Sequence, residues 1–460
     1  IGNGTNSTAG MGGLVGVVSS TYLITSNANP TITYCKNKGK VDGTVMGTGA
    51  GGTGTGTGGT GTGGILGVVS SAGKIERCSN SGQVIGINNV GGITGRTGPD
   101  TIHKECSNEG VIQASGKAYV GGIAGNISSV NFQNGSIGAG STIEKSCNTG
   151  NIIVIDASAV GGVGGITGTN GSAASYVQDS YSIGSIRVAG TASTIGVGGI
   201  TGEFSTDKSI TINRNNYFYK HNILVGISEE ELDIPRKTGD EIIGGFNIPI
   251  QEGAYESGEL AWRLDKGHTA QRSNEWGHDT VLNRPTLDIL TYPPVYRLLA
   301  EDSEHGMVTP GYLYTPNGTE ITLVITHDSG YTLKSLNLKD SGGKYYAPDF
   351  TPDNKTAAFF MPQANLTASP VFMLISEISG GPFTVTFDLN GGSGDIDPNP
   401  VNAGERVKEP AAPVKSGFKF AGWYDKSIVG AYGSDFFGKD SFDFSTIITE
   451  NINLIACWYP

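Results

Sequence analysis

The sequence is short of charge and of long apolar runs. Of its 460 residues, 16% are Asp, Glu, Lys or Arg, against roughly 25% in an average globular protein. So little charge excludes an expanded, self-repelling disordered chain. No run approaches the roughly 18 apolar residues of a membrane-spanning helix, so we expect no membrane insertion in this stretch. No strongly basic segment is present, which argues against a nucleic-acid partner.

The residues that carry metal or catalytic chemistry are scattered. The six histidines include no HExxH pair, which excludes the common metalloprotease signature. The five cysteines include no CxxC pair, which argues against a zinc site. His268 and His278 flank Trp276, and we interpret both as exposed loop residues. These absences predict a chain with no catalytic residue, no metal ligand and no cofactor.

Carboxylates are also too dispersed for polysaccharide cleavage, which needs a pair of acidic side chains in one cleft. Residues 1–216 contain 10 acidic residues, and their positions do not recur along the chain. The four that could approach one another, although no pattern selects them, are Asp156, Asp179, Glu203 and Asp207. An enzyme contained within this chain is therefore the third-ranked hypothesis.

Glycine is abundant, but mainly in the first part of the chain. Residues 1–216 hold 48 of the 73 Gly, 7 of the 38 aromatic residues and 2 of the 19 Pro. They carry 12 basic and 10 acidic residues, whereas residues 217–460 carry 18 and 32. The net charge of −12 therefore belongs to the second part. The composition predicts two different architectures that join near Asn216.

Two short motifs alternate through the first part. Gly-Gly-aliphatic-x-Gly begins at Gly12, Gly63, Gly91, Gly121, Gly164 and Gly198. Cys-x-Asn-x-Gly occupies residues 35–39, 78–82 and 106–110, with looser copies at residues 146–150 and 180–184. Between the motifs lie short runs of β-branched residues, which are typical of strands. A repeat this small cannot bury its own apolar side, so the sequence predicts a β-solenoid of about six stacked coils over residues 1–216.

The cysteines of the second motif should form a column along the stack. Cys35, Cys78 and Cys106 hold the same motif position, and we expect small buried thiols there. Cys147 comes one residue later, with Ser146 at the motif position, so it should face the opposite side. Neighbouring coils lie about 4.8 Å apart, a distance that leaves a Cys78–Cys106 disulfide open.

Glycine and threonine also recur at fixed motif positions. The glycine pairs suit tight corners with positive φ and a close backbone approach. Threonine recurs at one position of the first motif, in Thr94, Thr167 and Thr201, although Leu66 and Ala124 interrupt it. An exposed row of threonines would suit an ice-binding face. We consider this hypothesis much weaker than a structural role for the threonines.

These paired motifs resemble the GLUG-type glycine-rich repeats of large bacterial surface proteins. The resemblance covers roughly residues 10–216 and rests on two motifs that recur in fixed order. Related repeats precede the protease in some immunoglobulin A1 peptidases. The resemblance therefore implies a surface protein or the noncatalytic region of a large secreted enzyme.

The second part of the chain is predicted to contain a cap followed by two β modules. Residues 217–300 contain short helical patterns, one of them at residues 257–264, and should close the open end of the solenoid. Residues 301–376 alternate apolar and polar positions and predict a small all-β domain. The order His305-Gly, Gly330-Tyr331, Phe360-Met-Pro and Phe372 resembles bacterial repeat domains of immunoglobulin-like appearance.

Residues 380–460 carry the most specific signature. It comprises Phe387-Asp-Leu-Asn-Gly-Gly392, Gly417-Phe-Lys-Phe-Ala-Gly-Trp-Tyr424, Phe442-Asp-Phe444 and Ala456-Cys-Trp458. These residues resemble the Listeria-Bacteroides repeat, also called the internalin-type B repeat. The resemblance implies a compact β-grasp-like module on a bacterial surface protein.

The combined prediction is a non-enzymatic extracellular protein at the bacterial cell surface or cell wall, acting as an adhesin or stalk. The alternative is the noncatalytic region of a secreted peptidase or polysaccharide-degrading enzyme. A host matrix protein or a glycan is the expected partner, and the chain is expected to be monomeric. No residue of the sequence identifies the ligand or the binding face.

Overall fold

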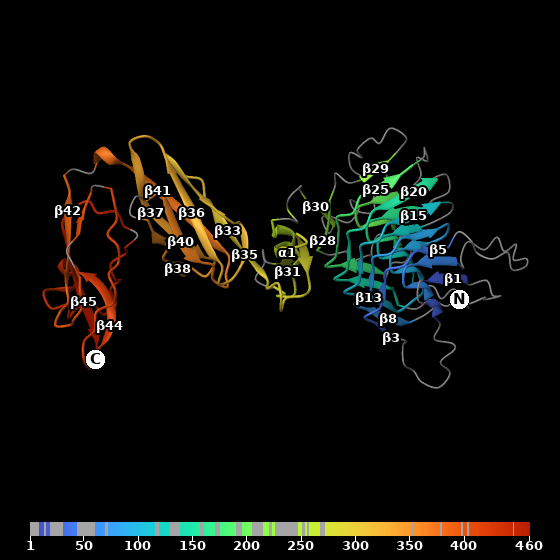
Figure 1. Ribbon diagram of the computed structural model, residues 1–460, viewed down its shortest axis with the longest axis horizontal. Helices are drawn as coiled ribbons and strands as arrows, with labels where there is room; N and C mark the ends of the chain where they lie inside the picture. The colour runs from blue at the N-terminus through green and yellow to red at the C-terminus, as the bar shows by residue number, and fades with distance from the viewer. Residues whose placement is uncertain are drawn as a thin grey trace, which may run out of the picture. The chain divides into compact units, whose positions relative to one another are not determined.

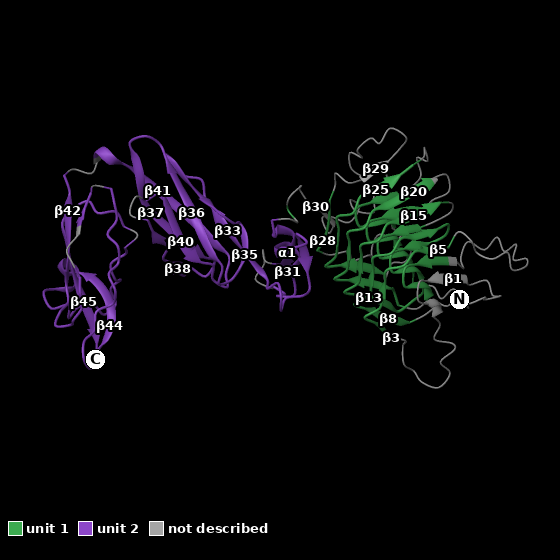
Figure 2. Cartoon of the chain, in the orientation of Figure 1, with its two compact units in different colours: residues 1–254 green, residues 255–460 purple. Residues whose placement is uncertain are grey.

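The structure is a computed structural model of the 460-residue chain. It has two compact units, residues 1–254 and residues 255–460, each described here by itself (Figure 2). The residues that it describes are 9–12, 15–18, 31–43, 60–69, 72–115, 119–128, 139–156, 161–170, 175–189, 196–204, 215–219, 223–225, 247–250, 254, 257–266, 272–351, 354–377, 380–396, 399–402, 404–444 and 446–460.

Unit 1 is a β-solenoid whose described strands form five parallel sheets (Figure 1). The first sheet contains β1 (Ala9–Gly12), β6 (Thr60–Gly63), β11 (Val90–Gly91), β16 (Tyr119–Gly121), β21 (Gly162–Gly164) and β26 (Gly196–Gly198). The second contains β2 (Val15–Val18), β7 (Leu66–Val69), β12 (Thr94–Thr97), β17 (Ala124–Ile127), β22 (Thr167–Asn170) and β27 (Thr201–Phe204).

The other three sheets complete each coil. The third contains β3 (Thr31–Thr33), β8 (Gly73–Glu76), β13 (Thr101–Lys104), β18 (Thr142–Glu144) and β23 (Tyr176–Gln178). The fourth contains β4 (Lys36–Asn37), β9 (Ser79–Asn80), β14 (Ser107–Asn108), β19 (Cys147–Asn148), β24 (Tyr181–Ser182), β28 (Asn216–Tyr219) and β30 (Asn247–Ile250). The fifth contains β5 (Val41–Asp42), β10 (Val84–Gly86), β15 (Ile112–Ser115), β20 (Ile152–Asp156), β25 (Ile186–Val188) and β29 (Ile223–Val225).

The parallel ladder continues past the boundary expected at residue 216. β28 pairs with β24, β29 pairs with β25, and β30 pairs with β28. The aromatic side chains of β28 made this segment look like a new architecture, yet Tyr217 and Phe218 occupy the same register as Tyr181 and Ser182. The expected cap at residues 217–300 is therefore divided, because these strands belong to the solenoid and residues 255–300 to unit 2.

The interior of the solenoid consists of aliphatic columns that run through successive coils. The third residue of the glycine motif forms one column, made of Ile65, Ile93, Ile123, Ile166 and Ile200, all fully buried. Val84, Ile112 and Ile152 form another on the fifth sheet. Each side chain covers the same residue type in the next coil, so the repeat buries an apolar side that one coil would leave exposed. The expected all-β solenoid of about six coils followed by smaller β modules is confirmed.

Among the described residues, the glycine pairs allow close approach but do not supply positive φ. A Cβ on Gly92 would lie 2.2 Å from the Gly122 carbonyl oxygen and 2.4 Å from the Asn108 amide carbon. The two motifs therefore occur together because the asparagine of one packs on the glycine of the other. Left-handed backbone instead occurs just before each cysteine-motif position, at Tyr34, Arg77, Glu105, Lys145, Asp179 and Asn215. The expectation of positive φ at the glycine pairs was wrong.

The recurring threonines lie inside the solenoid. Thr94, Thr167 and Thr201 share one register position with Leu66 and Ala124. All five side chains are fully buried. The hypothesis of an exposed ice-binding rank is therefore wrong, because this column faces the core.

Unit 2 begins with a small helix-and-hairpin segment. The segment contains α1 (Glu259–Leu264), β31 (Gly277–Asp279) and β32 (Arg284–Thr286). Trp262 of α1 packs with Val295 and Tyr314 of the following module. Its indole nitrogen donates to the Asn365 Oδ1 at 3.0 Å. These contacts join the helix to the β module that follows it.

The next module is a two-sheet sandwich. One sheet contains β35 (Tyr314–Pro316), β33 (Val295–Ala300), β41 (Leu366–Leu374), β37 (Tyr331–Asp340) and β38 (Tyr345–Tyr346). The other contains β34 (Gly306–Pro310), β36 (Glu320–His327), β40 (Thr356–Phe360) and β39 (Asp349–Phe350). Ile321, Leu323 and Ile325 of β36 are buried, and the residues between them are exposed. The predicted alternation is therefore present.

The last module has one mixed sheet and a short helix. The sheet contains β43 (Asn399–Val401), β42 (Phe383–Asp388), β45 (Ile452–Tyr459) and β44 (Lys419–Asp425), and α2 (Lys426–Val429) follows β44. The first and last strands, β42 and β45, are parallel at the centre of the sheet. Trp423 and Trp458 both pack edge-to-face on the Phe420 ring, with centroids 5.5 Å away in each case. These aromatic residues supply the core that so small a module needs.

Candidate functional site

A polar column follows the motif cysteines through the solenoid. The Cys106 amide donates to the Ser146 Oγ, and the Ser146 amide donates to the Ser180 Oγ, both at 3.1 Å. The Ser180 amide donates to the Asn216 Oδ1 at the same distance. The position therefore requires a small acceptor that satisfies the backbone amide of the preceding coil. Cysteine, serine and asparagine all meet this requirement, so the column has a structural role.

All five cysteines are free thiols. Cys78 and Cys106 are buried in the column, whereas Cys35 is partly exposed. Cys147 is also partly exposed and sits beside the fully buried Ser146. The predicted change of face at Cys147 is confirmed.

A second column consists of asparagine amides. Asn37 donates to Asn80, Asn80 to Asn108, and Asn108 to Asn148, with Nδ2 to Oδ1 distances of 2.7, 2.8 and 2.8 Å. Each Nδ2 also donates to the carbonyl oxygen of the glycine two residues later. Each link saturates amide groups that would otherwise be buried without partners. The sequence showed the recurring asparagine, but the ladder between coils depends on the register.

A grid of alternating charge covers one outer corner of the stack. Glu76-Arg77, Lys104-Glu105 and Glu144-Lys145 occupy matching positions in three successive coils. The Arg77 Nε lies 2.6 Å from the Glu105 Oε2. Bonds from Glu105 and Tyr34 raise the pKa of Arg77 above its ordinary value. Like charges would meet if the coils slipped by one residue, so the grid favours the observed register. In the aligned repeats, the order of the acidic and basic residue inverts from one coil to the next, and this inversion was the sequence signal for the grid.

His103 is a titratable residue buried in the solenoid interior. It takes the place that Ile75 and Ile143 occupy in the neighbouring coils. Its Nε2 lies 2.9 Å from the Thr94 Oγ1, so this ring nitrogen and the threonine hydroxyl are hydrogen-bonded to each other inside the core. Burial lowers the pKa of His103 to about 4. The imidazole is therefore neutral at physiological pH and is enclosed by the core.

The acidic residues considered for catalysis do not gather. Asp179 accepts a bond from the Asn215 Nδ2 at 2.8 Å and follows the third sheet. Glu203 lies on β27 of the second sheet. Asp207 and the side chain of Asp156 lie outside the described residues. Within the part of the chain that the structure describes, no group of three His, Cys, Asp or Glu residues could hold a metal ion.

One histidine near Trp276 is buried, whereas both were expected to be exposed loop residues. His278 lies on β31 and is 8% exposed, so its assignment as an exposed loop residue was wrong. It is buried because the hairpin packs its strand under α1, and Trp276 is 2% exposed. His268 lies outside the described residues. Among the residues described, no helix is long and apolar enough to cross a membrane.

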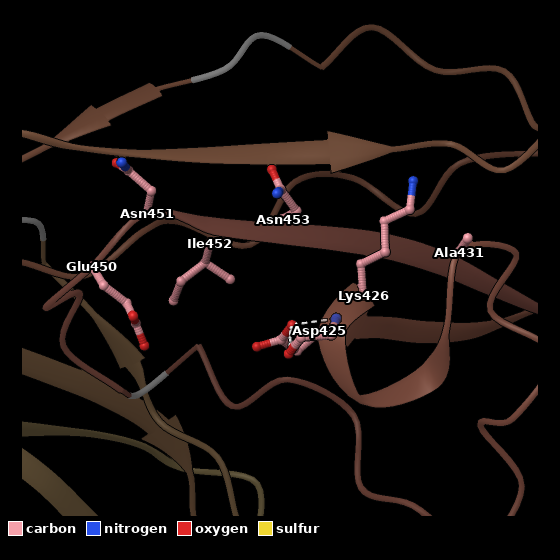
Figure 3. A pocket seen from close by; sticks show the side chains of 8 residues that line it. Asp425, Lys426, Ala431, Glu450, Asn451, Ile452 and Asn453 are labelled. Carbon is pink, nitrogen blue, oxygen red and sulfur yellow. Dashed lines mark hydrogen bonds between the residues drawn. The ribbon is translucent and has the colours of Figure 1, made fainter.

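A hollow of about 450 Å³ lies beside α2 in the last module (Figure 3). It is lined by Asp425, Lys426, Ser427, Ala431, Glu450, Asn451, Ile452 and Asn453. Asp425 accepts the Ser427 amide at 2.8 Å and caps α2. Figure 3 shows the Lys426 ammonium directed away from Asp425, and it lies 2.6 Å from the Asp388 Oδ2. Asp425 and Lys426 of the hollow thus serve the fold.

The signature residues of the last module are likewise used in folding. The Lys426 bond holds the pKa of Asp388 below its usual range. The Asn390 Nδ2 donates to the Tyr432 and Ala456 carbonyl oxygens, both at 3.0 Å. Lys415 donates to the Asn390 carbonyl oxygen at 2.8 Å. These signature side chains therefore maintain loop geometry.

Two family matches fall on the second unit. Residues 383–457 match the Listeria-Bacteroides repeat domain, as the sequence predicted. Residues 296–376 match the divergent InlB B-repeat domain. The immunoglobulin-like assignment of residues 301–376 and the GLUG-type assignment of the solenoid stay predictions.

Similar proteins occur in two bacteria. Internalin H of Listeria monocytogenes is 27% identical over 155 residues, covering 33% of this chain. A protein of Evansella cellulosilytica, described as an inferred membrane protein, is 34% identical over 93 residues, covering 20% of this chain. The matched segments span 25% and 12% of the lengths of these two relatives. No solved structure matches the chain.

Proposed function

We propose that this chain is a non-catalytic part of an extracellular bacterial surface protein and that it acts as an adhesin. The two internalin-type repeat modules in tandem carry the proposal. The similarity to Internalin H supports it, because that relative is 27% identical to this chain over 155 residues. Attachment to the cell wall and a host matrix protein or glycan as partner belong to the same proposal.

The distribution of polar groups supports a binding role over a catalytic one. In the described residues, the buried amides and thiols of unit 1 form columns that hold the coils together. The signature side chains of the last module hold its loops. A repeat scaffold whose inner groups are committed to folding offers its outer surface and insertions for recognition. We place the binding surface there and regard the protein as monomeric.

Binding of the purified full chain to immobilised matrix proteins and to a glycan array tests the adhesin role. We expect saturable binding to at least one target, and heat-unfolded chain should not bind. A folded chain that binds no target in either format would overturn the adhesin role. The alternative, a noncatalytic region of a secreted enzyme, is supported by the paired solenoid motifs and predicts no such binding.

A further inference from the structure

Three thiols stand in register at one end of the solenoid. Cys35, Cys78 and Cys106 immediately precede β4, β9 and β14, which pair in parallel. The Ser79 amide donates to the Cys35 carbonyl oxygen at 2.8 Å, which fixes the first two cysteines side by side in adjacent coils. The Cys78 sulfur lies 3.6 Å from the Ile32 carbonyl oxygen and so points toward the first coil.

We propose that Cys35 and Cys78 form a reversible disulfide that fastens the first coil to the second. Adjacent strands lie about 4.8 Å apart, within the roughly 4.4–6.8 Å range of Cα separations in disulfides. The Cβ atoms of a disulfide lie about 3.5–4.5 Å apart, so the two coils must approach slightly. Among the described strands, those of the first coil pair on one side only, which leaves that coil able to make this movement.

The same geometry disfavours a Cys78–Cys106 bridge. Both side chains are buried, with exposed fractions of 0% and 1%, so neither is open to an oxidant. Their coils are also each held between two others. Cys35 is partly exposed and offers the entry point. Contact with the Cys106 side chain lowers the pKa of Cys78 below its ordinary value.

The reaction requires a small disulfide such as oxidised glutathione as oxidant. Burial and the neighbouring Cys78 raise the pKa of Cys35, so the small fraction of Cys35 that loses its proton starts the reaction. This thiolate attacks one reagent sulfur, the reagent S–S bond breaks, and one glutathione thiol leaves. The Cys78 thiolate then attacks the Cys35 sulfur of this mixed disulfide and releases the second glutathione. Two cysteine thiols are oxidised, one reagent disulfide is reduced, and the two cysteine protons end on the two glutathione thiols.

Peptide mapping of the full chain tests the proposal. The folded protein is incubated with oxidised glutathione at pH 7.5, then unfolded in denaturant and capped with iodoacetamide so that every remaining free thiol reacts. It is digested without reductant and analysed by mass spectrometry. We expect a cross-linked peptide pair that contains Cys35 and Cys78 and is lighter by two hydrogens. Cys106, Cys147 and Cys457 should carry the cap.

Two variants complete the experiment. Cys78→Ser should keep the fold, because serine fills the same column position at Ser146 and Ser180. It should lose the cross-link and leave Cys35 as a glutathione adduct. Cys147→Ser is the control and should form the cross-link as the original chain does. A Cys78–Cys106 cross-link, or capped Cys35 and Cys78 in the oxidised folded chain, would overturn the proposal. Failure here would leave the adhesin proposal untouched.

Discussion

The Asn80 Nδ2 donates a 2.8 Å hydrogen bond to the Asn108 Oδ1 in the neighbouring coil. A Cβ added to Gly92 would meet the same Asn108 amide at 2.4 Å. This pair of contacts explains why the two sequence motifs recur in fixed order. The asparagine saturates the polar groups of its neighbours, and the glycine leaves room for it.

Asn108→Ala should destabilise unit 1 by about 3 kcal/mol, because it leaves buried partners in Asn80, Asn148 and Gly110 unsatisfied. Hydrogen exchange of β9, β14 and β19 peptides would measure the loss. Ser107→Ala, at the adjacent outward position, is the control and should change stability by less than about 0.5 kcal/mol. Equal exchange in both variants would show that the ladder contributes little.

Gly110→Ala should destabilise the solenoid, while Gly39→Ala should be tolerated. A Cβ at Gly110 would lie 2.0 Å from the Gly82 carbonyl oxygen, so the coils would have to separate. At Gly39 the nearest atom is the Asn37 Oδ1 at 3.8 Å. Overpacking of this kind costs about 1–3 kcal/mol or more. Thermal denaturation of both variants compares the same motif position in two coils, and similar midpoints would contradict the packing explanation.

Unit 1 should lose stability on acidification because of His103. Its pKa is about 4 in the folded chain and about 6.5 when unfolded. A lowered folded pKa gives a contribution that is complete above pH 6.5 and is lost as pH falls through 4. The loss amounts to about 3 kcal/mol.

Urea unfolding of unit 1 between pH 7 and pH 4 measures this dependence. His103→Leu should flatten it, since no imidazole then needs protonation. His327→Gln, at an exposed strand end, should keep the original slope. Parallel pH profiles for His103→Leu and the original chain would refute the assignment.

Arg406→Ala should weaken unit 2. The Arg406 Nη2 donates to the Leu333 carbonyl oxygen at 2.9 Å, and its guanidinium lies 4.2 Å from the Phe350 ring centroid. The side chain is 7% exposed, so truncation removes both packing and a buried bond. We expect a loss of about 2–3 kcal/mol. Calorimetry would detect it, and the exposed Lys408→Ala should leave the melting temperature unchanged.

The stacked β architecture could be predicted because motif order and β-branched runs are local properties of the chain. The end of the solenoid could not. Tyr217 and Phe218 resemble the aromatic second part in composition, and only the register shows that they continue the fourth sheet. The left-handed corner at Arg77 was also missed, because a long, non-glycine side chain such as arginine rarely adopts positive φ.

The predicted absence of catalytic residues stays a proposal. What the structure adds is the structural contacts made by individual polar residues of the last module. Asp388 and Asn390 belong to a recognisable signature, yet their partners Lys426 and Ala456 are distant in sequence. Sequence alone could identify the family of this segment, whereas the structural role of each signature residue required the contacts. The buried His278 was misread because its partners come from α1 and the hairpin together.

Protease treatment of intact bacteria that express the protein tests the central claim most directly. Trypsin is applied to whole cells, and the released peptides are identified by mass spectrometry beside a cytoplasmic marker. The surface-protein account predicts peptides from both units in the supernatant while the marker stays inside the cells. Release of these peptides only after lysis, together with the marker, would contradict it.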